Sequence, residues 1–205
     1  LISRDNKTTF ALPALLYTPE QKKDRFPATI IVSQYGKNDS LTQSVIAEEL
    51  QKGRMVLALD VCNTGELKDN RKIDSNNCEF WIAKLPLFEG KTLLAYRTED
   101  ILLAGNYLKK LDTADPKNIS IVSIGFTGPA ALHAGVFGSL FKNIQVIGAI
   151  TSWEDVANAN HSKDQLGNVV PNALNYYDLP DLVRLMPQTP VRFVSPVDAE
   201  GKDKN

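Results

Sequence analysis

One hydroxyl-bearing residue, Thr127, lies where the sequence predicts a sharp turn from a strand into a helix. It is the centre of the pentapeptide GFTGP (residues 125–129), which follows the β-branched apolar run 119–124. A hydroxyl at such a turn can attack a carbonyl carbon if a base removes its proton. The stretch therefore predicts either nucleophilic chemistry at Thr127 or an ordinary strand-to-helix turn without chemistry.

The pentapeptide differs from the G-x-S-x-G motif at two positions. In that motif a strained turn projects the nucleophile above a sheet, and the next backbone N–H helps to form an oxyanion hole. Here threonine replaces serine, and Pro129 replaces the last glycine. Positive φ is an outlier for a β-branched residue, so these changes favour the turn without chemistry.

Two histidines, His133 and His161, are the possible bases of the chain. His133 lies about a turn and a half along the expected helix at ~3.6 residues per turn, so it points away from Thr127. His161 falls in a polar segment that could fold over the strand ends, which makes it the better internal candidate. A packed or solvent-exposed residue is the alternative for both histidines.

Length, composition and charge limit the number of domains and the kinds of partner that the chain can have. The chain has 205 residues, 43% of them hydrophobic, and a formal net charge of −1. These values predict one domain over residues 1–205 and give no basic field for nucleic acid or anionic membranes. We therefore expect no nucleic-acid partner and no membrane partner. The first residue is leucine, which suggests a fragment of a longer protein.

Cysteine and histidine are too few and too widely spaced for a metal site. Cys62 and Cys78 are the only cysteines, and they could form a disulfide or remain two thiols. Neither has the spacing of a zinc ligand pair. We predict no metal and no cofactor.

Apolar runs alternate with stretches of helical spacing along the chain. This order predicts an α/β fold, with a mostly parallel sheet and helices on both faces. The expected strands are 8–17, 28–33, 54–60, 119–124, 144–150 and 191–194. The expected helices are 41–51, 98–111, a helix from residue 129 and a short helix over 178–185 that Asp178 could cap.

Polar segments connect these elements. Residues 63–77 are predicted as a surface loop, and residues 153–177 as an excursion over the sheet. Ligands of parallel sheets bind beyond the carboxyl ends of the strands. We therefore expect one face of the molecule to carry the loops at Gln34, Asp60, Thr127, Ser152 and Asp198.

The order of elements, the loops SQYGK (33–37) and LDVCNTGE (59–66), and the turn at 125–129 together resemble an α/β-hydrolase. More narrowly, the chain is similar to the acetyl xylan esterase-like carbohydrate esterases of bacterial polysaccharide-degrading proteins. The segments YDLPDL (177–182) and SPVDA (195–199) are similar to that group's sequence before and around its acidic residue. The resemblance implies an α/β-hydrolase-like fold whose last strand and helix are missing from this chain.

The resemblance also implies roles for individual residues. Thr127 stands at the nucleophile position, and Asp198 at the position of the acid that orients a catalytic histidine. The N–H of Gly128 and the loop from Ser33 to Gly36 stand at the oxyanion hole. The family supplies its histidine from a loop beyond the acid, and this sequence has no histidine after Asp198.

Two functions are therefore expected. The first is a carboxylic ester hydrolase (esterase) that deacetylates plant polysaccharide, with catalysis impaired at Thr127 and its histidine supplied from outside this sequence. The alternative is a pseudoenzyme, a non-catalytic hydrolase-like module that binds carbohydrate or supports a neighbouring domain. Trp153, just beyond a strand, could stack on a sugar ring or be a buried core residue.

The resemblance implies two further expectations. A missing last strand would leave an open sheet edge, through which a homodimer could form. A periplasmic or secreted location is favoured by the resemblance alone.

Overall fold

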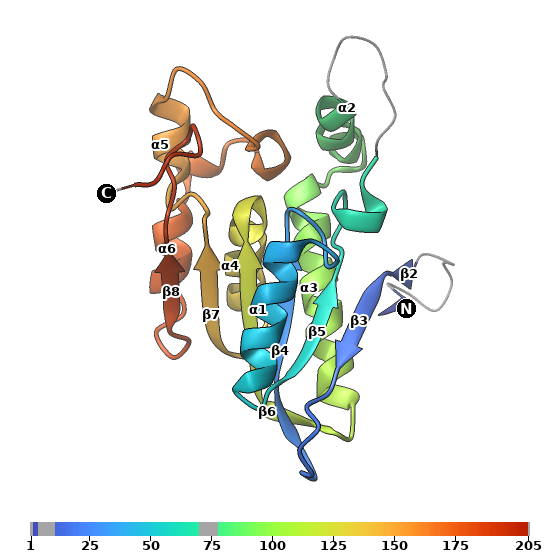
Figure 1. The fold of residues 1–205 in the computed structure, drawn as a ribbon. Coiled ribbons are helices and arrows are strands. Elements are labelled where there is room, and N and C mark those ends of the chain that lie inside the picture. The colour runs from blue at the N-terminus through green and yellow to red at the C-terminus, as the bar shows by residue number, and fades with distance from the viewer. Residues whose placement is uncertain (1, 4–10, 70–77, 205) are drawn as a thin grey trace.

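A six-stranded mixed sheet forms the centre of the computed structural model, which describes residues 2–3, 11–69 and 78–204. The strand order is β3-β5-β4-β6-β7-β8; β3 runs antiparallel to β5, and the other strands run parallel (Figure 1). The strands are β3 (Ala14–Tyr17), β4 (Phe26–Ser33), β5 (Met55–Leu59), β6 (Ala114–Ile124), β7 (Phe141–Ile147) and β8 (Val191–Val194). A separate antiparallel pair joins β1 (Ile2–Ser3) to β2 (Ala11–Leu12).

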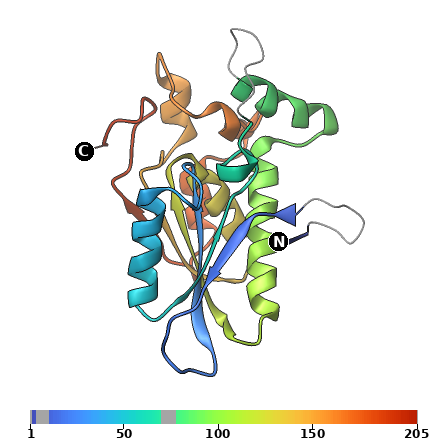
Figure 2. The same cartoon turned by 45° about the vertical axis from the view of Figure 1, so that its right-hand side comes forward.

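Helices cover both faces of the sheet (Figure 2). On one face lies α1 (Ser40–Gln51), and on the other lie α3 (Leu93–Lys110), α4 (Gly128–Phe137) and α6 (Leu179–Arg184). Successive residues of a strand point to opposite faces. Ile30 and Val32 therefore pack toward α3 and α4, whereas Ile31 packs against Ile46 of α1. The predicted α/β-hydrolase-like arrangement of sheet and helices is confirmed.

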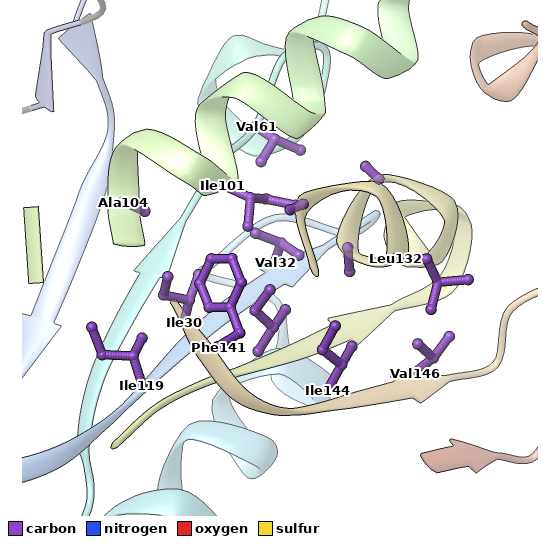
Figure 3. Close-up of a cluster of buried hydrophobic side chains, with 14 of the residues drawn as sticks. Ile30, Val32, Val61, Ile101, Ala104, Ile119, Leu132, Phe141, Ile144 and Val146 are labelled. Carbon is purple, nitrogen blue, oxygen red and sulfur yellow. The ribbon is translucent and has the colours of Figure 1, made fainter. Parts of the chain in front are cut away.

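The larger core lies between the sheet and the α3–α4 face. Figure 3 shows its side chains converging from β4, β6, β7, α3 and α4. Leu132 of α4 packs there with Ile144 and Val146 of β7, and all three are at least 99% buried. Burial of such side chains stabilises a fold by about 1.5–3 kcal/mol each. This core fixes the position of the turn that joins β6 to α4.

Two excursions lie beyond the carboxyl ends of the strands (Figure 1). The first contains the 3₁₀ turn η1 (Gly65–Leu67), α2 (Cys78–Lys84) and the 3₁₀ helix η2 (Leu85–Glu89). The second contains α5 (Trp153–Asn158) and the 3₁₀ turns η4 (Leu166–Asn168) and η5 (Ala173–Asn175). No helix among the described residues combines the length and the apolar character that a membrane crossing requires.

Some element boundaries differ from the sequence-based expectations. Helix α3 begins at Leu93 rather than at 98, because Thr92 caps it by accepting a hydrogen bond from the N–H of Ala95 at 3.0 Å. Strand β6 begins at Ala114 rather than at 119, because Ala114 pairs with Phe26 of β4. Helix α2 was not predicted. The expected loop 63–77 and the expected strand 8–17 fall partly outside the described residues.

Candidate functional site

The turn between β6 and α4 adopts an unstrained conformation at Thr127. A 3₁₀ turn, η3 (Gly125–Thr127), follows the strand, and Thr127 has φ −78° and ψ −8°, in the right-handed helical region. The positive φ of the turn, +70°, occurs at Gly125 instead. Glycine adopts positive φ without a steric cost. The chain therefore makes its sharp turn two residues before the hydroxyl.

The hydroxyl of Thr127 points into the protein. The side chain is fully buried, and Oγ1 lies 3.0 Å from the carbonyl oxygen of Ile124 and 3.2 Å from that of Val32. A hydroxyl has one proton to donate, and both neighbouring acceptors belong to the backbone. In this structure the Thr127 hydroxyl therefore bonds to the carboxyl ends of β4 and β6 instead of presenting its oxygen to a ligand.

The backbone N–H groups of the turn are also used inside the protein. The N–H of Gly128 donates to the carbonyl oxygen of Gly125, and the N–H of Phe126 donates to Gln34 Oε1 at 2.9 Å. A Cβ atom at Gly125 would lie 2.1 Å from Gln34 Oε1, so a larger residue there would displace the Gln34 side chain and also adopt a strained positive φ. The predicted oxyanion donor at Gly128 is therefore engaged in a 3₁₀ bond.

The backbone N–H groups of the second predicted oxyanion segment, from Ser33 to Gly36, also donate to acceptors within the protein. The N–H of Gln34 donates to Ile124 O at 3.0 Å, and the N–H of Gly36 donates to Ser33 O at 3.1 Å. The N–H of Tyr35 donates to Ser33 Oγ at 3.2 Å. An oxyanion hole needs donors aimed at the position where charge develops. These three N–H groups already have protein acceptors.

Asp198 and His161 do not assemble with Thr127. Asp198 Oδ1 accepts hydrogen bonds from the N–H groups of Glu200 and Lys202, both at 2.9 Å, so its carboxylate closes its own turn. His161 is exposed to solvent. Among the described residues, no hydrogen bond links Thr127, His161 and Asp198 to one another.

His133 is held in a buried aromatic cluster. Its Nδ1 lies 2.7 Å from the carbonyl oxygen of Pro129, and its Nε2 lies 2.9 Å from Tyr177 Oη. The carbonyl requires a proton on Nδ1, and in the neutral ring, which burial favours, Nε2 accepts the tyrosine proton. Burial lowers the pKa of His133 and raises the pKa of Tyr177. His133 is therefore a packed residue that holds α4 to the segment before α6.

Trp153 joins this cluster from the start of α5. Its ring centroid lies 5.6 Å from those of His133 and Tyr177, and the side chain is 8% exposed. Its backbone N–H donates to Asp178 Oδ1 at 2.7 Å. Asp178 also caps α6 with a capping box, as the sequence predicts. Asp178 thus bonds to the first residue of α5 and caps α6, and its bond to the Trp153 N–H helps to orient Trp153.

Several hollows lie at this end of the described structure, and two of them bear on the predicted site. The smaller, of about 80 Å³, is bounded by Gln34 and Phe126, by Gln165 and by Val197 beside Asp198. It lies where the resemblance places an active site, yet Thr127 does not line it. The larger, of about 390 Å³, lies between α5 and residues 165–175 and includes Trp153 in its wall.

A buried arginine, which the sequence-based analysis missed, ties the two excursions to the turn. Arg97 of α3 is 1% exposed, donates from Nε to Cys62 O at 3.0 Å, and stacks 4.5 Å from the ring centroid of Phe126. The amide of Asn168 donates to Phe126 O at 3.0 Å. The sequence carried a signal, because Arg97 falls four residues before Ile101 in an apolar helical stripe.

No group of three or more potential metal ligands gathers within the described part of the chain. The side chain of Cys78 lies outside the described residues, so the state of the cysteines stays a prediction.

Comparisons with solved structures identify the fold. A protein from Bacteroides fragilis NCTC 9343, provisionally assigned as an acetyl xylan esterase, matches with a TM-score of 0.76 and 14% identity over 95% of this chain and 57% of its own. Acetyl xylan esterase 1 from Thermoanaerobacterium sp. matches with a TM-score of 0.60 and 12% identity over 87% of this chain and 58% of its own. Est1E from Butyrivibrio proteoclasticus with bound ferulic acid matches with a TM-score of 0.55 and 16% identity, over 85% and 66% respectively.

The chain thus has an α/β-hydrolase fold like that of acetyl xylan esterases, as its sequence predicts, and spans 57–66% of the length of these structural relatives. No protein-family model matches the sequence, and no curated protein matches it significantly. Structural matches at such low identity establish the fold and carry no activity with them.

Proposed function

We propose that this α/β-hydrolase-fold domain is a non-catalytic module that binds carbohydrate or its ester substituents. The inward orientation of the Thr127 hydroxyl carries the proposal, because that oxygen is fully buried and directed at the carbonyls of Val32 and Ile124. A nucleophile must reach the carbonyl carbon of its substrate and pass its proton to a base. Among the described residues, Thr127 has no exposed surface, and the hydrogen bonds of its hydroxyl go to backbone carbonyls rather than to a base.

The surrounding donors support the same proposal. Ester hydrolysis passes through a tetrahedral oxyanion, and one oxyanion-hole donor is worth about 10²–10³ in kcat. Here the N–H groups of Gln34, Tyr35, Gly36 and Gly128 already donate to protein acceptors. Opening this site would require breaking several backbone hydrogen bonds at once.

Carbohydrate and its esters are proposed as ligands from the nature of the similar structures. Two of these relatives are described as acetyl xylan esterases, and a third holds ferulic acid. Those names belong to the relatives. For this chain they supply a ligand class to test, and they point to a site beyond the strand ends, where parallel sheets bind ligands.

A carboxylic ester hydrolase of acetylated plant polysaccharide is the second candidate. The small hollow of about 80 Å³ favours it, since Phe126 of the turn and Val197 beside Asp198 both line it. In this case a longer protein or another chain would supply the catalytic histidine, and the turn at Thr127 would have to open.

Hydrolysis of 4-nitrophenyl acetate tests whether the turn at Thr127 is catalytic with the residues that this chain itself contains. The chain would be assayed beside Thr127→Ala, Thr127→Ser and a heat-treated sample. We expect every folded sample to match the heat-treated rate, because the hydroxyl at position 127 is directed inward. His161→Gln is the control for slow reaction of an exposed imidazole with the activated ester. An activity that Thr127→Ala removes would establish the esterase instead, and its loss in His161→Gln as well would identify His161 as the base.

A further inference from the structure

We propose that the cavity between α5 and residues 165–175 binds an uncharged organic ligand with a flat apolar face and a few hydroxyl or carbonyl groups. A phenolic ester and an acetylated sugar residue both have this chemistry. The inference rests on the proposed function, because it assigns the place and the chemistry of the binding. It does not involve Thr127, which lies outside the walls of this cavity.

Size and position fit a small-molecule site. The cavity holds about 390 Å³, within the ~300–1,000 Å³ that ligand pockets usually occupy. It lies beyond the carboxyl ends of the strands, where parallel sheets bind ligands. Two of its wall residues, Val169 and Leu174, are 53% and 47% exposed, so the cavity opens to solvent.

The lining determines the chemistry of the ligand. Seven of the eleven residues are aliphatic or aromatic, four are amides, and none is charged. A charged ligand placed against such walls would lose hydration without gaining an opposite charge. Apolar walls with few polar groups instead favour a flat apolar body whose orientation is fixed by hydrogen bonds.

The amides divide into two pairs. Deep in the wall, Asn168 donates to Gln165 Oε1 at 3.1 Å, and Gln165 donates to Lys163 O at 3.1 Å, so the protein holds these two side chains in place. At the exposed rim, Asn175 donates to Asn172. Each amide has two donors and an acceptor oxygen, so the rim pair retains donors and acceptors for a ligand.

Trp153 supplies an independent observation. It lines the cavity, it is 92% buried, and its indole Nε1 has no hydrogen-bond partner among the described residues. A buried donor without an acceptor costs about 1–3 kcal/mol. Because Nε1 has almost no accessible surface, Trp153 faces the cavity through the apolar part of its indole ring, on which a flat ligand can pack.

A matched pair of probes tests whether the cavity prefers a neutral ligand to a charged one. Binding of methyl 4-hydroxybenzoate and of 4-hydroxybenzoate would be measured at pH 7.5 by isothermal titration calorimetry with the 205-residue chain. A second arm uses methyl 2,3,4-tri-O-acetyl-β-D-xylopyranoside, which distinguishes the sugar source from the aromatic one. We expect at least one neutral probe to bind, and the carboxylate to bind at least about tenfold more weakly than its methyl ester if the aromatic probe is the one that binds.

A matched pair of variants tests the location. Ala157 is exposed on α5 and lines the cavity, whereas its exposed neighbour Asn158 does not. Ala157→Leu should weaken binding by about tenfold or more by filling the cavity, and Asn158→Leu should leave binding unchanged. Circular dichroism would confirm that both variants fold. An equal loss in both variants, or no binding of any neutral probe up to its solubility limit, would overturn the proposal.

The same samples separate this inference from the proposed function. Chromatography of the methyl 4-hydroxybenzoate mixture would detect hydrolysis, in which water adds and methanol leaves. Binding without hydrolysis agrees with both proposals. Hydrolysis that Thr127→Ala removes would overturn the non-catalytic function even if binding in the cavity is intact. If no probe binds and none is hydrolysed, only the inference that the cavity binds a ligand would be overturned.

Discussion

His133 and Thr127 show how a reactive side chain becomes structural when its polar atoms form hydrogen bonds within the protein. Thr127 directs its hydroxyl to two backbone carbonyls, and His133 places its ring between Pro129 O and Tyr177 Oη. The first measurable consequence concerns the protonation of His133.

The unfolding of the protein should depend on pH through His133. Burial holds its pKa below the ordinary value, while in the unfolded chain it titrates near 6.5. The unfolded state therefore binds more protons below about pH 6.5, so the free energy of unfolding should fall as the pH drops from about 7 to about 5.5 and be level above that range. Urea unfolding at a series of pH values measures this.

Two variants isolate the histidine responsible. His133→Gln should lower the overall stability and remove most of the fall between pH 7 and 5.5. His161→Gln, at an exposed position, should keep the fall. Wild-type pH dependence in His133→Gln would show that other groups produce it.

At the scale of elements, a buried ion pair joins the loops that follow β4 and β5. Lys37 and Asp60 are 3% and 1% exposed, and Lys37 Nζ donates to Asp60 Oδ2 at 2.6 Å. The other carboxylate oxygen accepts from the Lys37 N–H at 2.8 Å. Glu66 contacts the same ammonium group from the surface. Burial alone would lower the pKa of Lys37, but its bonds to Asp60 and Glu66 outweigh burial and raise it.

Neutralising either of the two carboxylates of this cluster should lower the free energy of unfolding, but by very different amounts. Asp60→Asn removes the buried partner of the Lys37 ammonium and leaves only Glu66 at the surface, so we expect a loss of about 3 kcal/mol in the free energy of unfolding. Glu66→Gln removes a carboxylate that is 59% exposed, and it should cost less than about 1 kcal/mol. Urea denaturation of both variants at pH 7 measures the difference. Equal losses would mean that Asp60 contributes no more than a surface charge.

At the scale of the whole molecule, β8 forms one edge of the described sheet. Among the described strands it pairs with β7 alone, and it has four residues. Val197 extends the edge through isolated bridges to Ile150 and Asp203. Short edge strands with an exposed charge, such as Arg192 here, resist pairing with another chain.

Dimerisation through β8 stays a prediction, and these features make a weak dimer the expected form. Light scattering over a concentration series should show the 22.6 kDa mass of one chain at micromolar concentration and a rise at higher concentration. Raising the salt concentration tests whether the Arg192 charge opposes pairing, because salt screens repulsion between exposed charges. A constant mass up to the solubility limit would contradict the prediction of a dimer.

The sequence by itself determined the fold class and most of the elements. β-branched runs such as 28–33 and 119–124 can be buried on both faces only in a covered parallel sheet, and their alternation with amphipathic helices leaves few topologies. Local capping was equally readable, since Asp178 followed by Pro180 predicts the start of α6, where the structure has it. These features depend on neighbours in the sequence, so the sequence contains them.

Only the tertiary structure decided what the candidate residues do. The pentapeptide at 125–129 is compatible with an exposed or an inward hydroxyl, and the choice was made by Val32 and Gln34, which are more than ninety residues away in the sequence. The cavity at Trp153 likewise forms only where α5 meets residues 165–175. The direction of a side chain is set by partners that the fold brings together, and spacing along one segment does not contain that information.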